Sequence, residues 1–133
     1  MAQDTEAVAR RLIDEYNRGS PDWVEACHAE TTEWLELPFL GGPGRQGGRA
    51  ALRKAAEDQV ANFPDRRMKI ISVTGNATQV ALEVDWTGTA AKATAWAAVG
   101  AKLHLRAVML LTVSDGRVVR EIDYVIPMPM PAG

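Results

Sequence analysis

The chain has 133 residues, of which 47% are hydrophobic and 24% are charged, which is typical of a soluble globular domain. A formal net charge of −2 gives no electrostatic reason to expect a nucleic acid or an anionic membrane surface as partner. The single cysteine excludes an internal disulfide, and the cysteine and two distant histidines predict no metal site. The polar N-terminus does not resemble a secretory leader, and no apolar run is long enough to span a membrane. We therefore expect one soluble, cytoplasmic domain over residues 1–133.

The first part of the chain is patterned as helices. Asp4 or Thr5 can cap a first helix that ends at Gly19, and its apolar residues recur at helical spacing as Val8, Leu12 and Tyr16. Ser20 and Pro21 are typical of the start of a second, short helix. We expect His28 late in that helix and partly exposed.

A short strand over 31–39, stopped by Pro38, follows these helices. The next segment, 40–48, is rich in glycine and predicts a flexible flap rather than a phosphate-binding loop, because it lacks the lysine of such loops. Residues 48–63 have the composition of a third helix, closed by Pro64.

Beyond Pro64 the hydrophobic period changes from 3.6 to 2, which indicates strands. We expect five of them, over 68–76, 80–88, 93–99, 102–114 and 118–126. Short turns at Gly75-Asn76 and Asp115-Gly116 favour antiparallel pairing. Helices followed by such strands predict an α+β fold, in which a cone-shaped, curved antiparallel sheet wraps around about three N-terminal helices and encloses a cavity.

Several local patterns, in this order, resemble the nuclear transport factor 2-like superfamily and, within it, the SnoaL-like cyclases and isomerases. They are Tyr16-Asn17-Arg18-Gly19, Trp34 to Pro38, Phe63-Pro64-Asp65 and Asp115 to Val119. The resemblance covers nearly the whole chain. It implies the cystatin-like α+β barrel fold, an internal pocket and chemistry without a cofactor.

Within this superfamily, the subfamilies can be distinguished by the residues at their functional positions. Steroid isomerases of this fold carry a tyrosine and two aspartates at positions that align with Leu12, Leu37 and Met109. These three residues are apolar, so we do not expect steroid isomerisation by that machinery; Leu12 and Met109, with Tyr16, are expected to contact the substrate instead.

The limonene-epoxide-hydrolase branch is more similar. Its Tyr-x-Asn-x-Pro, Arg-x-Asp and Asp-Tyr patterns match Trp34-x-Glu36-x-Pro38, Glu83-x-Asp85 and Asp123-Tyr124. The two aspartates are kept, whereas the arginine is replaced by Glu83. SnoaL-like cyclases likewise have an acid/base aspartate on the last strand. The resemblance thus implies catalysis by Asp123 and Asp85, with substrate contacts from Trp34, Glu36 and Glu83.

Whether these carboxylates reach a pocket depends on which face of each strand points inward. We expect Glu83 and Asp85 inside and the alternate residues outside: Val80, Leu82, Val84 and Trp86. On the last strand we likewise expect an inner set (Val119, Glu121, Asp123 and Val125) and an outer set (Val118, Ile122, Tyr124 and Ile126). The strand over 102–114 would present an apolar wall of Leu103, Leu105, Ala107, Met109 and Leu111, with His104 and Arg106 outside.

An apolar outer face requires a partner, and the simplest one is a second copy docked sheet to sheet. The alternative parity, with Val80 to Trp86 in the core and the carboxylates in solvent, is the usual arrangement of a surface strand.

Two functions follow. In the first, the chain is an enzyme without cofactor, in which Asp123 is the base and Asp85 the protonated acid, acting on a small hydrophobic molecule. The reaction would be epoxide opening, or cyclisation or isomerisation of a polyketide-like carbonyl compound. In the second, the same fold is a non-catalytic module that binds a small ligand or dimerises.

Overall fold

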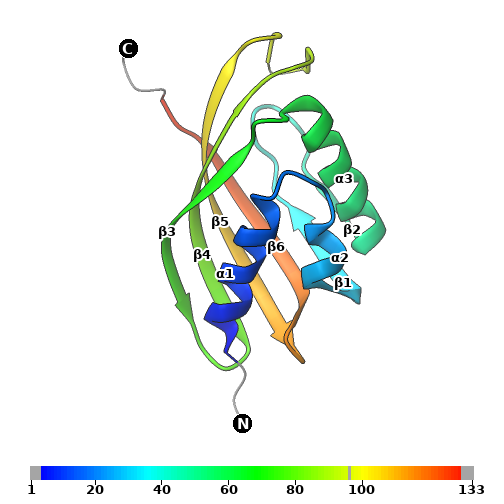
Figure 1. Cartoon of the computed structure of the whole chain (residues 1–133), viewed down its shortest axis with the longest axis vertical. Coiled ribbons are helices and arrows are strands. Elements are labelled where there is room, and N and C mark those ends of the chain that lie inside the picture. The colour runs from blue at the N-terminus through cyan, green and yellow to red at the C-terminus, as the bar shows by residue number, and fades with distance from the viewer. Residues whose placement is uncertain (1–3, 96, 130–133) are drawn as a thin grey trace.

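A computed structural model describes residues 4–95 and 97–129 of the chain (Figure 1). Within these ranges three helices accompany a six-stranded sheet. The elements are α1 (Thr5–Tyr16), α2 (Trp23–Cys27), β1 (His28–Glu36), β2 (Arg45–Gly47), α3 (Arg49–Asn62), β3 (Arg67–Gly75), β4 (Gln79–Thr89), β5 (Lys102–Ser114) and β6 (Arg117–Pro127). None of the helices in this part of the chain is long and apolar enough to cross a membrane.

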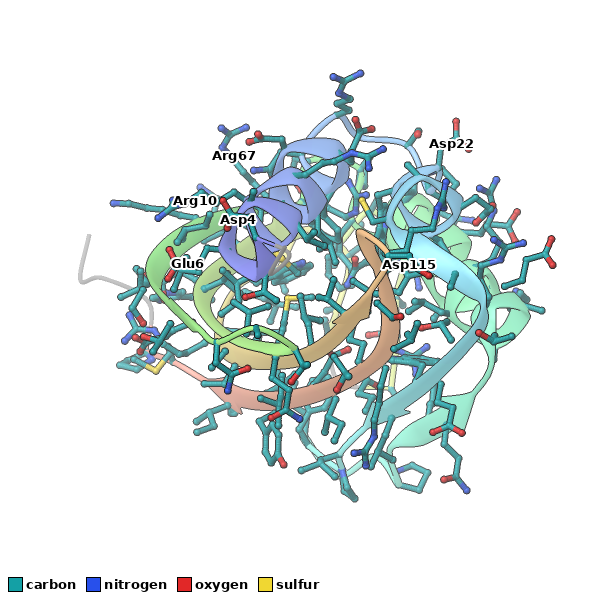
Figure 2. The ribbon with its side chains drawn as sticks, turned by 90° about the horizontal axis from the view of Figure 1, so that it is seen from below. Asp4, Glu6, Arg10, Asp22, Arg67 and Asp115 are labelled. Carbon is teal, nitrogen blue, oxygen red and sulfur yellow. The ribbon has the colours of Figure 1, made fainter. Side chains whose placement is uncertain are left out.

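The sheet confirms the predicted cone-like α+β fold. Its strand order is β2-β1-β6-β5-β4-β3, and every neighbouring pair is antiparallel except β1 and β6, which are parallel. The strands curve around the side chains beneath α1, so that one face of the sheet is concave (Figure 2). Most of the chain separates β1 from β6, so no tight turn constrains these two strands to run antiparallel.

Helix α1 closes part of the concave face. Asp4 caps it as predicted, since its side-chain oxygen accepts the Ala7 N–H at 3.0 Å. Glu6 and Arg10 are exposed, and the apolar face of the helix packs on β3, β4 and β5. Beyond its end, the Asn17 amide exchanges two hydrogen bonds of 2.9 Å with the Met68 backbone, which fixes the end of α1 to the start of β3.

Three segments differ from the sequence prediction. No strand forms over the described residues of 93–99; Thr94 N–H donates to Ala97 C=O in an isolated bridge, and Trp96 lies outside the described residues. The glycine-rich segment contains the short strand β2, which pairs with β1. His28 is fully buried and begins β1 instead of ending α2, so the expectation of a partly exposed histidine is wrong.

The predicted parity of β4 is also wrong. Its apolar residues Val80, Leu82, Val84 and Trp86 are all buried on the concave face, and Glu83 and Asp85 therefore lie on the outer face. The physical reason is the cover that α1 and α3 give to the concave face: the Trp86 indole needs that cover, and its N–H donates to Tyr16 Oη at 2.7 Å.

The parity of β6 is correct around Asp123, although Ile122 on the outer face is buried rather than exposed. Glu121 and Asp123 point into the concave side, and Tyr124 and Ile126 are exposed on the outer face. Val118, expected outside, is fully buried because a register irregularity at Thr112 and Val113 of β5 shifts the start of the strand. On β5 the inward set was predicted correctly, with Leu105, Ala107, Met109 and Leu111 buried.

Candidate active site

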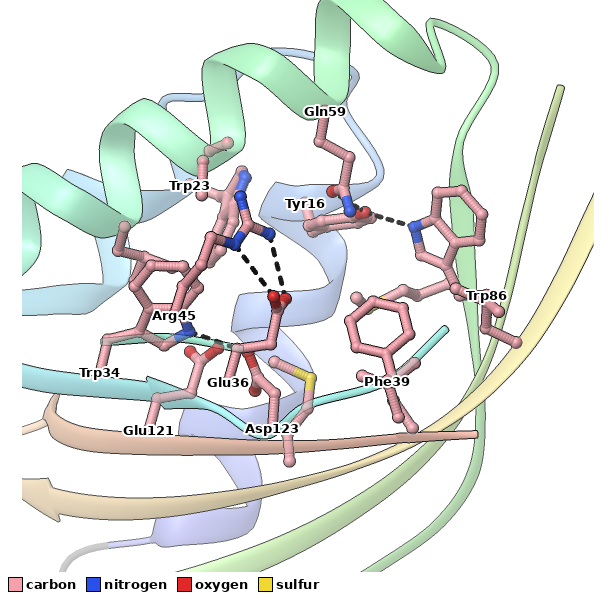
Figure 3. Close-up of a pocket in the computed structure, with 18 residues that line it drawn as sticks. Tyr16, Trp23, Trp34, Glu36, Phe39, Arg45, Gln59, Trp86, Glu121 and Asp123 are labelled. Atoms are coloured by element: carbon pink, nitrogen blue, oxygen red, sulfur yellow. Dashed lines mark hydrogen bonds and ion pairs between the residues drawn. The ribbon is translucent and has the colours of Figure 1, made fainter. Parts of the chain in front are cut away.

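A cavity of about 90 Å³ lies between α3 and the concave face of the sheet (Figure 3). Aromatic and aliphatic side chains form most of its wall, and its polar groups come from only a few positions. Members of the wall include Tyr16, Trp23, Trp34, Trp86, Leu105, Met109 and Val125. A wider depression of about 460 Å³ adjoins it and shares Glu36, Phe39, Arg45, Gln59 and Trp86 with it. The cavity is therefore the inner end of a larger cleft, and the 42–44 loop forms one rim of that cleft.

Asp123 is the acidic group at the floor of this cavity. Its Oδ2 accepts the Trp34 indole N–H at 3.0 Å (Figure 3). Its Oδ1 is shielded from solvent, and the Asp123 side chain shares a further hydrogen bond with the Glu121 carboxyl. Burial in apolar surroundings, and next the negative charge of Glu121, raise the pKa of the Asp123 carboxyl well above its usual value. A carboxylate here is a stronger base than one in water.

Glu121, two residues earlier on the same face of β6, is bound from behind. Its Oε1 lies 2.7 Å from Nε2 of His28, whose Nδ1 lies 3.0 Å from the Val24 carbonyl oxygen. Both side chains are almost completely inaccessible to solvent. Burial raises the pKa of Glu121 to about 7 and lowers the pKa of His28 to about 4, so that both groups favour their neutral forms.

The wall opposite these carboxyls is a neutral hydrogen-bonded cluster. The Tyr16 hydroxyl accepts the Trp86 N–H at 2.7 Å and donates to the Gln59 side-chain oxygen of α3. Burial raises the pKa of Tyr16 far above its ordinary value, and so it stays protonated. The Arg66 guanidinium lies 4.1 Å above the Tyr16 ring centroid, as in a cation–π contact. These bonds orient Trp86 and leave the Tyr16 hydroxyl committed to protein partners.

A charged pair stands where the cavity meets the outer cleft. Arg45 of β2 donates from Nε and Nη2 to the two carboxylate oxygens of Glu36, at 2.9 and 3.1 Å (Figure 3). The guanidinium also lies 5.3 Å from the Trp34 ring centroid. This bidentate contact fixes the flap segment against β1 and offsets the negative charge of Glu36 near Asp123.

The structure places five of the eight predicted site residues at this cavity: Asp123, Trp34, Glu36, Tyr16 and Met109. Two are on the other side of the sheet. Asp85 accepts from Arg106 Nε at 2.8 Å and lies 3.1 Å from His104 Nε2, whereas Glu83 accepts from Ser72 at 3.0 Å. Neither can reach a ligand bound inside, so their assignment to the pocket is wrong. Leu12 is buried in the core beside the cavity and does not line it.

Sequence reasoning missed His28, Arg45, Gln59 and Trp23 as members of the site. Arg45 and Gln59 come from a glycine-rich flap and a polar helix, where no pattern distinguishes an inward side chain from an exposed one. Trp23 lines the cavity, and its indole N–H is buried without a partner among the described residues. A buried His28 could have been suspected from the apolar residues Val24 and Cys27 that precede it.

The arrangement supports proton transfer. Between residues 4 and 129, leaving out position 96, no three His, Cys, Asp or Glu side chains are placed to hold a metal ion. What the cavity offers is a hydrogen-bonded carboxyl pair with raised pKa values and the buried indole N–H of Trp23, which has no partner among the described residues, all inside apolar walls.

Comparisons with known proteins identify the family and agree with the fold. Residues 9–121 match the model of the SnoaL-like domain family. Curated protein sequences give no match. Among solved structures, IdmH of Streptomyces antibioticus, a proposed polyketide cyclase, is 17% identical, with a TM-score of 0.79 over 92% of each chain. A SnoaL-like polyketide cyclase of Agrobacterium tumefaciens is 16% identical, with a TM-score of 0.74 over 93% of this chain and 92% of its own. AclR of Streptomyces galilaeus, a proposed hydroxylase, is 19% identical, with a TM-score of 0.76 over 90% and 76%.

Proposed function

Because the chain belongs to the SnoaL-like domain family, we propose that it is a cofactor-independent acid/base enzyme that cyclises or isomerises a small hydrophobic carbonyl compound of the polyketide type. The observation that carries this proposal is the state of Asp123. Its Oδ1 lies buried in an apolar cavity, where Trp34 and the Glu121 carboxyl are the hydrogen-bond partners of the Asp123 side chain. An enzyme that removes a proton from carbon needs a strong, desolvated base of this kind.

The reaction can be written with Asp123 alone as the proton carrier. Asp123 Oδ1 takes a proton from a carbon next to a carbonyl group, and the electrons of the C–H bond form an enolate. In an isomerisation the proton returns at another carbon. In a cyclisation the enolate carbon attacks a second carbonyl of the same molecule, a C–C bond forms, and the new alkoxide takes the proton back from Asp123. Atoms and electrons balance without a co-reactant.

Two further groups suit this chemistry. The unpartnered Trp23 N–H lines the same cavity and could donate to the enolate oxygen, where negative charge develops. Flat aromatic side chains, Trp34, Trp86 and Phe39, favour a planar conjugated substrate. Epoxide opening by an Asp85–Asp123 pair is not proposed, because Asp85 lies on the outer face of the sheet.

The test is a proton-exchange assay that does not require the natural substrate. The probe is 2-tetralone, a small hydrophobic ketone, and its α-hydrogen exchange in heavy water is followed by proton NMR. We expect the wild type to accelerate exchange, and Asp123→Asn to lose at least about 100-fold of that acceleration. Asp85→Asn is the matched control, because it makes the same change on the outer face, and we expect it to stay within about twofold.

Full exchange activity in Asp123→Asn would contradict the proposed role of Asp123 as the base. A wild type that binds 2-tetralone, seen as perturbed tryptophan signals, but gives no exchange above the control would favour the alternative function, a non-catalytic module that binds a small ligand.

We also propose that two copies of the chain pair through the outer face of β5 and β6. Val108, Tyr124 and Ile126 are exposed there, and the register places Val108 opposite Tyr124. Such a contiguous apolar surface on a sheet suits a symmetric contact with itself. Sedimentation equilibrium tests this: we expect a dimer for the wild type and a monomer for Tyr124→Asp. A monomeric wild type would contradict the pairing.

A further inference from the structure

We propose that His28 is a positioning residue that holds a proton on Glu121 and thereby leaves Asp123 as the ionised member of the carboxyl pair. This inference deepens the proposed function, from which it takes its catalytic meaning. It names the group that decides which of two adjacent carboxyls is the base.

The hydrogen-bond partners of His28 determine its tautomer. A backbone carbonyl oxygen can only accept hydrogen bonds, and the Val24 carbonyl lies 3.0 Å from Nδ1 of His28. Nδ1 therefore carries a hydrogen. A neutral imidazole has one N–H, so Nε2 then has a lone pair and must accept.

The lone pair on Nε2 faces the Glu121 carboxyl. Glu121 Oε1 lies 2.7 Å from Nε2, which is a normal hydrogen-bond length. An ionised carboxylate has no hydrogen to donate, so beside a neutral His28 the hydrogen between the two atoms belongs to Glu121. The remaining possibility is an ion pair of doubly protonated His28 and ionised Glu121.

The surroundings of the pair decide between these two forms. The side chains of His28 and Glu121 are 0% and 1% exposed, and an ion pair without solvent loses the hydration of both charges. Arg49 and Arg117 each donate to the His28 carbonyl at 3.4 Å, which places two positive charges beside a histidine that would gain a third. Burial of the imidazole, the largest influence on its pKa, acts in the same direction.

The other titratable groups around the pair do not reverse this conclusion. They are Asp123 on β6, Glu36 on β1, Glu25 and Cys27 on α2, and Tyr16 on α1. Glu25 and Asp123 favour a charged His28. The hydrogen bond from Asp123 lowers the pKa of Glu121 and Glu36 raises it, but burial is the largest influence and raises that pKa to about 7, so the neutral form of Glu121 remains favoured below that pH.

A proton held on Glu121 affects the protonation of Asp123. Two carboxyls two residues apart on one strand face share protons as a coupled pair, and without a further contact the proton could be held by either group. His28 approaches only Glu121, whereas Asp123 receives the Trp34 N–H, which favours its anion. A hydrogen bond with Glu121 acts on Asp123 in the opposite direction. His28 and Trp34 thus differentiate two groups of the same chemistry.

The test uses NMR on the wild-type chain and two variants, without any ligand. Long-range nitrogen spectra report the His28 tautomer, and carboxyl carbon spectra report Glu121 and Asp123, assigned with Glu121→Gln and Asp123→Asn. Between about pH 5 and pH 8 we expect His28 to carry hydrogen on Nδ1 only. Glu121 should remain protonated at pH values where Asp123 is ionised.

His28→Leu removes the acceptor, and His104→Leu is the matched control on the outer face, where His104 lies 3.1 Å from Asp85. In His28→Leu we expect the separate titrations to be lost, so that the Glu121 and Asp123 signals shift over the same pH range. In His104→Leu both should follow the wild type.

A doubly protonated His28 with an ionised Glu121 in the wild type would overturn the inference, and so would unchanged carboxyl titrations in His28→Leu. The wild-type measurement stands even if His28→Leu does not fold. Failure of the 2-tetralone assay with the NMR pattern intact would instead contradict the proposed function alone.

Discussion

Strands β4 and β6 contain the same acidic pattern, Glu83-Val84-Asp85 and Glu121-Ile122-Asp123, with opposite results. The first pair lies on the outer face of the sheet and the second on the inner face. Strand β5 lies between them and supplies a neighbour to each: Arg106 is opposite Asp85, whereas Met109 is opposite Asp123. Identical carboxyls thus meet a guanidinium on one side and a thioether on the other.

This difference in neighbours sets the chemistry. The hydrogen bond from Arg106 lowers the pKa of Asp85 below its usual value, as a surface ion pair does. Burial without a cation raises the pKa of Asp123. A carboxyl pattern in a sequence is therefore compatible with either a stabilising surface contact or a base, and the face of the strand decides between them.

We expect the largest effect when a charge is placed on the buried, concave face of β4. Leu82→Asp places an uncompensated carboxyl at a residue that is 0% exposed, and we expect a loss of at least about 3 kcal/mol in unfolding free energy. The adjacent change Glu83→Leu, on the outer face, should alter it by less than about 1 kcal/mol. Urea unfolding measures both.

Equal losses in the two variants, or a larger one in Glu83→Leu, would contradict the orientation of β4. The comparison is internal to one strand, so a general intolerance of β4 to substitution would appear in both variants.

A second change gives Asp123 the kind of neighbour that Asp85 has. Met109→Lys puts an ammonium opposite Asp123 across the β5–β6 pair, and an opposite charge at such distances lowers a carboxyl pKa by about 1–3 units. Because the base must be ionised, the acid side of the exchange–pH profile should move to lower pH by that amount. A profile that stays in place, in a variant whose circular dichroism matches the wild type, would indicate that Asp123 does not titrate in the assay.

The sequence predicted the fold far better than the site. The succession of helices and then strands, the Asp4 cap and the inward face of Glu121 and Asp123 could be derived because helical and strand periods are local. The absent strand over the described residues of 93–99 and the unpredicted β2 show the limit of such local patterns. The parity of β4 could not be derived, because both of its faces are consistent with a strand: Val80 to Trp86 suit a core or an interface equally well. The choice depends on α1 and α3 covering one face, and those contacts join residues far apart in the sequence.

The site depends on such distant contacts even more. The contact between His28 and Glu121 joins residues 93 positions apart, and that between Trp34 and Asp123 joins residues 89 positions apart. Arg45 reaches Glu36 only because β2 folds back on β1. The resemblance to a known family identified Asp123 correctly as a pocket residue. It also assigned Asp85 and Glu83 to the pocket, whereas in this chain both lie on the outer face, where Arg106 forms ion pairs with them.

The smallest expected effect is also the one that compares the two aspartates most directly, through the pH dependence of stability. A lowered pKa in the folded state stabilises above the unfolded value of 3.8 and is lost as the pH falls, so Asp85→Asn should cost up to about 1 kcal/mol at neutral pH and little in acid. A raised pKa does the reverse: its stabilisation is complete below 3.8 and is lost as the pH rises through the folded value. Asp123→Asn has no carboxyl to ionise and so avoids this loss of unfolding free energy. The unfolding free energy of the variant should therefore rise relative to that of the wild type as the pH increases above 3.8. Unfolding curves of the two variants across pH should therefore diverge with opposite signs, and parallel curves would show that both carboxyls share one environment.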